Sequence, residues 1–338
     1  MVSMKEIAER CGVSVATVSK ALNNHNDIST ATKERISQIA SEMGYYPNVA
    51  ARTLKTNRSY NIGVLFSDAA HSGLTHDYFS AVLESFKNEA ESHGYDITFI
   101  NTNDNTMSYL ERCRQRSFDG VVIACIDFTK PGAIELMNAD IPTVTIDYNS
   151  NFCSSVTSDN QTGISSLVEY VIQQGHKRIA YIHGDSASAV TKTRLAGFYR
   201  TLADHNITIP NEYVCASRYL DVPLARHFTE VLLKLKVPPT CILYPDDTAL
   251  IGGANCIRDM GLRIPDDISI AGFDGLKVSR YLDPKIATFR QNTTQIGSRA
   301  AMQLINQIEN PKTTLIERIV INGNLVTGES VAAPKKIR

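Results

Sequence analysis

The sequence of 338 residues lacks any apolar run of roughly 18 or more residues, the length that a membrane-spanning helix needs. Its seven cysteines are an odd number without C-x-x-C spacing, which argues against a disulfide or zinc framework and for buried thiols in a reducing compartment. The segment MVSMKEIAERCG carries charges where a signal peptide needs apolar residues. We therefore expect a cytoplasmic protein without a membrane partner.

Common enzyme signatures are also missing. The sequence contains no G-x-x-x-x-G-K-[ST] phosphate loop, no H-E-x-x-H and no G-x-S-x-G. A DNA-tethered sugar kinase would need glycine-rich phosphate loops, so it is excluded on the same ground. His71 and His76 lie near Asp68 and Asp77, as in a metal site, but a polar loop accounts for the same residues. We expect no catalysis, no metal site and no cofactor.

The small net charge of −1 hides an uneven distribution. Residues 1–60 contain eight Lys and Arg against five Asp and Glu, a net charge of +3, which leaves −4 for the rest of the chain. A basic N-terminal segment favours a polyanionic partner such as nucleic acid.

The N-terminal segment is predicted to form short helices. Ser3 and Glu6 form an S-x-x-E capping box, which predicts a helix over residues 4–11. Ser14 is placed to cap a second helix from residue 15 to about residue 23. A third helix begins near residues 29–32, and its core stripe at i, i+3, i+4 and i+7 consists of Ile36, Ile39, Ala40 and Met43.

Two short helices joined by a tight turn and supported by a third are typical of a helix-turn-helix, although a generic three-helix module would show the same pattern. On the second helix, Val15, Ala16, Ser19, Lys20 and Asn23 share an arc of about 140°. These side chains are short apart from one cation, so the arc can approach base edges in a major groove closely.

The segment GYYPNVAARTLKT predicts a further helix over residues 49–55, with Asn48 as its N-cap. A helix this short is below the roughly 12–15 residues needed for stability in water, so it needs a partner to hold it. Leu54 is apolar and sits between the cations Arg52 and Lys55. That arrangement suits a wedge between base steps in a minor groove.

From residue 60 onward, short apolar runs alternate with amphipathic stretches, which predicts parallel sheets covered by helices on both faces. About 280 residues are too many for one such sheet, so two doubly wound halves with a cleft between them fit better. The expected strands are residues 62–66, 96–100, 120–126, 142–146, 178–182, 240–244 and 268–273.

The motifs KEIAERCGVSVATVSKALNN, I-S-x-x-T-K-E-R-I and GYYPNVAARTLKT, over residues 4–56, resemble the DNA-binding headpiece of the lactose/galactose-repressor (LacI/GalR) family. The resemblance implies that the second helix reads the major groove and that the hinge helix orders on DNA as part of a homodimer. It also implies a pseudo-palindromic double-stranded operator, with Leu54 prying open the central base step.

The resemblance assigns DNA-binding roles residue by residue. Val15 and Ala16 are apolar where several relatives carry polar readers, so contact with a thymine methyl is the expected readout there, while Lys20 can donate to guanine. The full set of expected DNA-binding residues is Val15, Ala16, Thr17, Ser19, Lys20, Asn23, Tyr45, Asn48, Ala51, Arg52, Leu54 and Lys55.

The motifs SDNQTG, QQGHKRIAYIHG, TRLAGF, LRIPDDISIAGFDG and P-x-I-A-T-F-R-Q resemble the family's effector-binding core, which is similar to type I periplasmic sugar-binding proteins. The implied domains are residues 1–47 (helix-turn-helix), 48–59 (hinge helix and linker) and 60–338 (effector binding and dimerisation). Within the last, one half comprises about 60–160 and 292–322, and the other about 161–291 and 323–338.

The resemblance places an effector site in the cleft, at the carboxyl ends of the strands. Arg194 and Asp274 match positions that hold effector hydroxyls or ring nitrogens, although a surface cation and a turn residue are the simpler interpretations. The expected effector-binding residues are Tyr78, Tyr148, Asp159, Arg194, Tyr219, Asp246 and Asp274.

The segment ASAVTK, residues 187–192, has small residues where purine-binding relatives carry an Arg-x-Thr pair, which favours a neutral sugar over a purine. We expect a sequence-specific repressor of carbohydrate-utilisation genes.

The C-terminal SVAAPKKIR has no leucine heptads, so a homodimer is expected rather than a tethered tetramer. Three alternatives stay open, namely a sugar-binding receptor without a gene-control role, a regulator controlled by a purine, and a regulator controlled by a protein corepressor.

Overall fold

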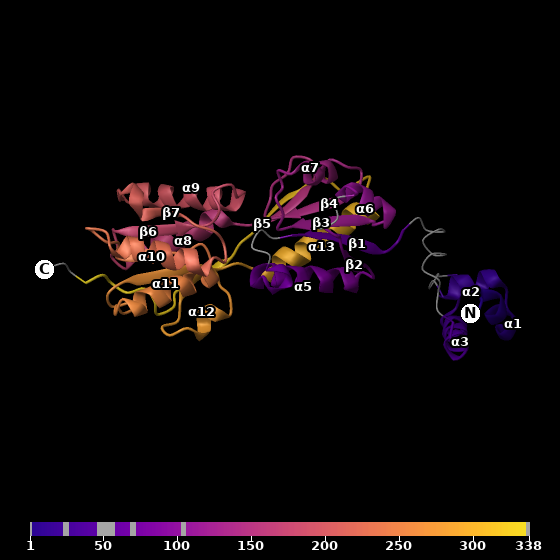
Figure 1. Cartoon of the computed structure of the whole chain (residues 1–338). Coiled ribbons are helices and arrows are strands. Elements are labelled where there is room, and N and C mark those ends of the chain that lie inside the picture. Colours follow the sequence, from indigo (N-terminus) through magenta and orange to yellow (C-terminus); the bar gives the residue numbers. More distant parts are fainter. Residues whose placement is uncertain (1, 23–26, 46–57, 68–71, 103–105, 336–338) are drawn as a thin grey trace. The chain divides into compact units, whose positions relative to one another are not determined.

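The computed structural model describes residues 2–22, 27–45, 58–67, 72–102 and 106–335 (Figure 1). The chain divides into two compact units, Met1–Ser59 and Tyr60–Arg338. Each unit has its own apolar core, and the two are considered separately below. The hinge helix predicted over residues 49–55 lies outside the described residues.

The smaller unit contains the three predicted helices, α1 (Met4–Cys11), α2 (Val15–Leu22) and α3 (Thr30–Glu42). The capping box at α1 is present, because Glu6 N donates to Ser3 Oγ at 3.3 Å and Ser3 N donates to Glu6 Oε2 at 2.7 Å. The three helices enclose a small core of Ile7, Ala8, Cys11, Val18, Ala21, Ile36 and Ala40. The predicted helix-turn-helix is confirmed.

The larger unit alternates strands and helices along the chain. Its strands are β1 (Asn61–Phe66), β2 (Asp96–Phe99), β3 (Gly120–Ala124), β4 (Thr143–Ile146), β5 (Ser154–Ser158), β6 (Ile179–His183), β7 (Val214–Ala216), β8 (Cys241–Leu243), β9 (Ser269–Asp274), β10 (Ala287–Arg290), β11 (Arg318–Ile321) and β12 (Asn324–Val326). Its α-helices are α5 (Asp77–Ser92), α6 (Tyr109–Gln115), α7 (Pro131–Met137), α8 (Asn160–Gln173), α9 (Ala189–Asp204), α10 (Val222–Leu233), α11 (Asp247–Asp259), α12 (Val278–Tyr281) and α13 (Thr293–Glu309). Two 3-10 turns, η1 (Gly73–Thr75) and η2 (Asn211–Tyr213), complete the described elements.

The strands form two six-stranded sheets (Figure 1). In the first sheet the order is β11-β5-β4-β3-β1-β2, and all neighbouring strands are parallel. In the second the order is β12-β10-β9-β8-β6-β7, in which β12 runs antiparallel to β10 and the other pairs are parallel. The chain passes between the sheets three times, after β5, β10 and β11. The predicted pair of doubly wound halves is confirmed.

Both faces of each sheet are covered, as buried parallel strands require. Along β3, Val122 and Ala124 pack in the core beneath α5 and α13, whereas Val121 and Ile123 pack in a second core beneath α6 and α7. The second sheet likewise packs against α8 and α9 on one face and against α10 and α11 on the other.

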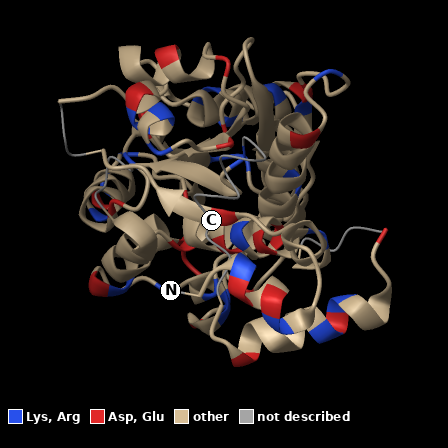
Figure 2. Cartoon of the chain, turned by 90° about the vertical axis from the view of Figure 1, so that its right-hand side faces the viewer, with Lys and Arg blue, Asp and Glu red and all other residues tan. Residues whose placement is uncertain are grey.

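Charged residues of both signs are spread over the helices of the chain. Figure 2 shows Lys and Arg interspersed with Asp and Glu along the exposed helices, which is typical of a solvated surface. Across the described ranges, no helix combines the length and the apolar character that crossing a bilayer requires.

Candidate functional site

The outward face of α2 carries the residues that were expected to read DNA. Val15 is 44 % exposed, and Ala16 and Lys20 are also exposed, whereas Val18 and Ala21 on the opposite side are buried. The helix begins at a side-chain cap, in which Thr17 N donates to Ser14 Oγ at 3.1 Å. Val15, Ala16 and Lys20 of the predicted arc are therefore presented to solvent on the three-helix unit.

The one cation on this face has a partner within the unit. Lys20 Nζ lies 2.5 Å from Asp27 Oδ2, and both side chains are about half exposed. An exposed pair of this kind is worth only about 0–1 kcal/mol, so Lys20 can exchange Asp27 for another acceptor at little cost.

The other expected DNA-binding residues divide into two groups. Thr17 and Ser19 are partly buried on α2, and Tyr45 packs against the apolar core of the unit. Asn23, Asn48, Ala51, Arg52, Leu54 and Lys55 lie outside the described residues.

In the larger unit, Arg194 of α9 is the centre of a buried polar cluster. Its side chain is 3 % exposed, with Nε donating to Asn160 Oδ1 at 2.8 Å and Nη1 donating to the Pro245 carbonyl at 2.9 Å. Nη2 lies 3.8 Å from Asp274 Oδ1, and the guanidinium carbon lies 3.6 Å from the centroid of the Phe273 ring. The interpretation of Arg194 as a surface cation is therefore wrong.

Asp274 ends β9 in a left-handed conformation with φ of 94°. Gln291 Nε2 donates to Asp274 Oδ1 at 2.6 Å, while Gln291 Oε1 is buried without a partner. Burial raises the pKa of the Asp274 carboxyl to about 6, and Arg194 works in the opposite direction.

The first half of the larger unit supplies a second acidic group, which sequence reasoning missed. Tyr78 of α5 is buried, and its hydroxyl donates to Asp147 Oδ2 at 2.7 Å. Asp147 directly follows β4 with a left-handed φ of 59°, and its Oδ1 accepts from Ser158 N at 3.4 Å. Burial raises the pKa of Asp147 and raises that of the Tyr78 hydroxyl well above its ordinary value.

A hollow of about 140 Å³ opens beside Asp147, between elements of the two halves. Its wall also includes Ser158, whose hydroxyl is buried and has no partner. Unpaired buried polar groups such as this one and Gln291 Oε1 are costly unless a ligand or water completes them. The hollow is lined by Asp147, Tyr148, Asn149, Thr157, Ser158, Asn160, Ala189, Val190 and Thr193.

The other two expected tyrosines, Tyr148 and Tyr219, lie at different places in this region. Tyr219 lies beside Arg194, with 5.8 Å from its ring centroid to the guanidinium carbon, and its hydroxyl is 2.8 Å from Thr191 Oγ1. Tyr148 lines the hollow and stacks on Phe128 with ring centroids 4.2 Å apart. Both present an aromatic surface next to polar groups.

Two further expected acids hold backbone groups. Asp159 Oδ1 accepts from Thr162 N at 3.0 Å at the start of α8. Asp246 Oδ1 accepts from Ala249 N at 2.7 Å at the start of α11, and its Oδ2 accepts from Leu220 N at 2.9 Å. Each carboxylate caps a helix, so each positions the loops around Arg194.

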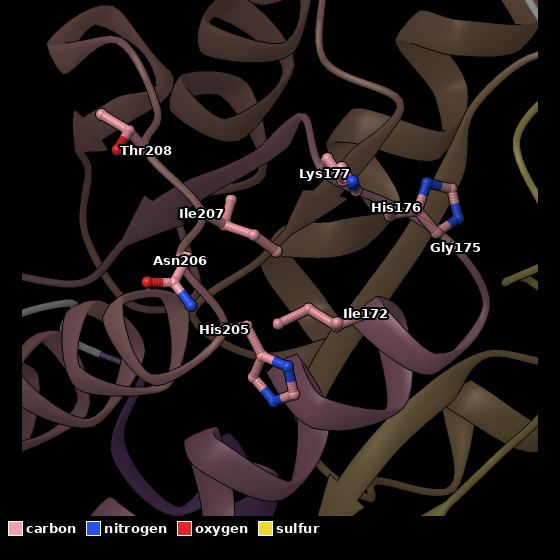
Figure 3. Close-up of a pocket in the computed structure, with 8 residues that line it drawn as sticks. All are labelled: Ile172, Gly175, His176, Lys177, His205, Asn206, Ile207 and Thr208. Atoms are coloured by element: carbon pink, nitrogen blue, oxygen red, sulfur yellow. The ribbon is translucent and has the colours of Figure 1, made fainter.

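A second hollow, of about 420 Å³, lies elsewhere in the larger unit (Figure 3). Its lining comes from the end of α8 and from the loop between α9 and η2, at Ile172, Gly175, His176, Lys177, His205, Asn206, Ile207 and Thr208. These loops precede β6 and β7, whereas Arg194 and Asp274 lie near the carboxyl ends of strands. Among the described residues, no cluster of three His, Cys, Asp or Glu side chains is arranged to hold a metal ion.

Comparison with known protein families gives two matches. Residues 3–48 match the model described as "Bacterial regulatory proteins, lacI family". Residues 168–331 match the model of a periplasmic binding protein-like domain. The two matches fall in the smaller and the larger unit, respectively.

Individual proteins are similar over the whole chain. The probable HTH-type transcriptional repressor ExuR of Bacillus subtilis is 32% identical over 334 residues, covering 98% of each chain. Among solved structures, the lac repressor dimer bound to operator and the anti-inducer ONPF has a TM-score of 0.81 at 23% identity, covering 98% of this chain and 99% of that one. The transcriptional regulator CelR in complex with cellobiose has a TM-score of 0.70 at 21% identity, covering 98% and 100%.

Proposed function

The chain belongs to the lacI family of bacterial regulatory proteins, and we propose that it represses genes of carbohydrate use by binding an operator under the control of a sugar. It is a DNA-binding transcription regulator and not an enzyme. The observation that carries the proposal is the buried cluster of Arg194, Asp274 and Asp147, with unpaired polar groups beside it, in a unit joined to an exposed recognition helix. We also infer that it acts in the cytoplasm, where a bacterial operator lies.

The DNA-binding role rests on the small unit. Val15 and Ala16 contact thymine methyl groups, and Lys20 leaves Asp27 to donate to a guanine, a contact worth about 1–3 kcal/mol of discrimination. Thr17, Ser19, Asn23 and Tyr45 contact or support the phosphate backbone. Two copies bind a pseudo-palindromic site, since a twofold dimer presents two identical helices.

The proposed hinge comprises residues 48–59, of which Asn48, Ala51, Arg52, Leu54 and Lys55 contact the minor groove. Leu54 wedges into the central base step, where a flexible pyrimidine–purine step lowers the cost of bending. The helix is too short to be stable alone, so it forms only when two copies meet on DNA.

The effector is proposed to be a sugar because the cluster offers hydroxyl-binding chemistry. Carboxylates accept from hydroxyls, and a guanidinium donates to them. The Tyr148 and Tyr219 rings flank these groups, while Asp159 and Asp246 hold the loops in place. CelR, a protein of the same fold, was solved with cellobiose. A purine or a protein corepressor is the competing controller.

Tyr78 and Asp147 come from the half built on the first sheet, whereas Arg194 and Asp274 come from the other half. A ligand that touches both groups changes how the halves sit against each other. That change biases pairing of the hinge helices, a coupling of about 1–3 kcal/mol in typical allosteric proteins.

A thermal-shift screen of the full chain against neutral sugars, purine bases and nucleosides tests the effector class. A ligand at about 100 times its Kd adds about 2.7 kcal/mol of stability, which raises Tm by several degrees. A rise with a sugar that is lost in Arg194→Lys supports the proposal. If Tm rises only with a purine, or rises with none of the ligands, the proposal is contradicted.

A further inference from the structure

We propose that the open edge of the first sheet, strand β11, joins two dimers of this chain by pairing antiparallel with β11 of a further copy. Such a contact involves neither the operator nor the effector, so it goes beyond the proposed function. Three features of the edge support it, namely its outward backbone groups, its exposed apolar side chains and its distance from the strand that follows the hinge.

Strand β11 is an edge strand with backbone groups that face solvent. Within the described part of the chain it pairs only with β5, in parallel register. The carbonyls of Glu317 and Ile321 accept, both at 2.9 Å, from backbone N–H groups in β5 or directly after it, so these two residues face β5. Because backbone direction alternates along a strand, the N–H and C=O groups of Arg318 and Val320 point outward. They are free to pair with another strand.

The edge is also apolar. Ile316, Val320 and Phe152 are each more than half exposed. The loop that carries Phe152 is held against β11, because Arg318 Nη2 donates to Asn151 Oδ1. Natural proteins normally cover or charge an edge strand, and an apolar edge left open favours pairing with another chain. The partner that fits this edge is therefore a protein strand.

A second copy of the chain is complementary to this edge. With a twofold axis at Ile319, Arg318 of each copy pairs with Val320 of the other, and both outward residues form backbone hydrogen bonds. An axis at Arg318 would set the two Arg318 side chains directly opposite each other, and an axis at Glu317 would do the same to the two glutamates. Like charges directly opposite destabilise paired strands. An axis at Val320 would use Asn322, which lies in the crossover to the second half. The charge pattern therefore favours pairing about Ile319.

Strand β11 lies far from the strand that follows the hinge. The order β11-β5-β4-β3-β1-β2 separates β11 from β1 by four strand spacings, or about 19 Å at about 4.8 Å each. The hinge is continuous with β1, so two copies that share one operator are held together near β1, and the β11 edge of each stays open. Pairing of these edges then joins one dimer to another and brings two pairs of recognition helices into one assembly.

Disulfide trapping in the full chain tests the pairing and its register. The Cα atoms of a non-hydrogen-bonded antiparallel pair lie about 4.5 Å apart, within the range of about 4.4–6.8 Å that a disulfide needs. Ile319→Cys should therefore link two chains on mild oxidation, giving a band of doubled mass on a non-reducing denaturing gel. Val320→Cys is the matched control, because its two copies would lie at diagonal positions, about 7–8 Å apart. The wild type gives the background, since six of its seven cysteines are buried.

Sedimentation velocity of the full chain without DNA, over a range of concentrations, measures the assembly. We expect the wild type to pass from two to four chains as the concentration rises. Val320→Lys places a second cation opposite Arg318 of the other copy, so it should weaken this step by at least about tenfold while leaving the dimer intact. Val231→Lys, at an equally apolar and 43 % exposed position of α10, should not change the step.

A wild type that stays a dimer at every concentration overturns the proposal, and so does a four-chain assembly that Val320→Lys leaves unchanged. A disulfide through Val320→Cys but not through Ile319→Cys overturns the register. If Val320→Lys is a single chain, β11 is the contact within the dimer and not between dimers. Neither experiment uses an operator or a sugar, so their outcome is independent of the proposed function.

Discussion

The guanidinium carbon of Arg194 lies 3.6 Å from the centroid of the Phe273 ring, and Asp274 follows directly on the same strand. The ring excludes water from one face of the cation, while Asn160 and Pro245 hold its donors. Arg194 thus joins α9 to the start of α8, through Asn160, and to the loop after β8, through Pro245. Its removal should affect both stability and ligand response.

Arg194→Ala leaves Asp274 buried without its cation, so we expect the free energy of unfolding to fall by about 3–5 kcal/mol. Arg200→Ala on the same helix is the matched control, since Arg200 is 71 % exposed and pairs with an equally exposed Asp204. That change should cost no more than about 1 kcal/mol. Urea denaturation of both variants measures the difference, and equal losses would contradict the structural role given to Arg194.

Asp274 should make stability depend on pH. Its pKa is raised from 3.8 to about 6 in the folded chain, so the folded state holds the proton over a range in which the unfolded state has lost it. The free energy of unfolding therefore falls as pH rises from about 4 to about 6, by on the order of 1–3 kcal/mol.

Asp274→Asn lacks this titration and should gain stability relative to the wild type across that range, with a constant difference above about pH 7. Asp204→Asn, at a 67 % exposed position, is the control. Urea titrations from about pH 4 to about pH 8 give the comparison. A difference between Asp274→Asn and the wild type that does not vary with pH would show that Asp274 is ionised throughout.

Lys20 and Asp27 give a prediction for DNA binding. Lys20→Met should weaken binding to the preferred operator by about 1–3 kcal/mol and relax the base preference at one position in each half-site. Lys5→Met, an equal loss of charge at an exposed position of α1, should weaken all sequences alike. Asp27→Asn should strengthen binding slightly, because Lys20 then has no charged partner to leave. Fluorescence anisotropy with operator variants measures these affinities. If Lys20→Met kept the full base preference of the wild type, Lys20 would not be a base-reading residue.

Leu54→Ala should weaken operator binding strongly while leaving effector affinity unchanged, because the wedge acts only on DNA. A conservative Leu54→Met control should retain most of the affinity, since a long apolar side chain remains. Titration of each variant with operator and with effector separates the two effects. Equal operator affinity of Leu54→Ala and the wild type would refute the wedge.

The sequence predicted the elements whose local signals agree with the fold. The three N-terminal helices were recognisable from caps and apolar spacing, and β1, β3 and β9 from continuous apolar runs. Strand β5, with the sequence SSVTS, was not predicted because its buried residues are mostly hydroxyl-bearing. Ser154 is satisfied there by Gln303, Gln307 and the Glu317 backbone N–H, which are distant in sequence. The short edge strands β7, β11 and β12 and the strand β10 were also missed.

The candidate site was predicted in part. Arg194 and Asp274 were named through the family resemblance, and the structure places them together. Asp147 was missed although it follows an expected strand, where the carboxyl-end rule points to ligands. Its importance depends on Tyr78, which is 69 positions away and is brought within 2.7 Å only by the fold. The orphaned Ser158 hydroxyl could not be found without coordinates for the same reason.

The most direct test of the account is the operator affinity of the full chain with and without the sugar found by thermal shift. An operator selected from random DNA, at fixed salt, supplies the binding site. The account predicts that saturating sugar changes the operator Kd by about 5–150-fold in the wild type, with no change in Arg194→Lys. An operator Kd that is the same with and without bound sugar would contradict the claim that the cleft controls DNA binding.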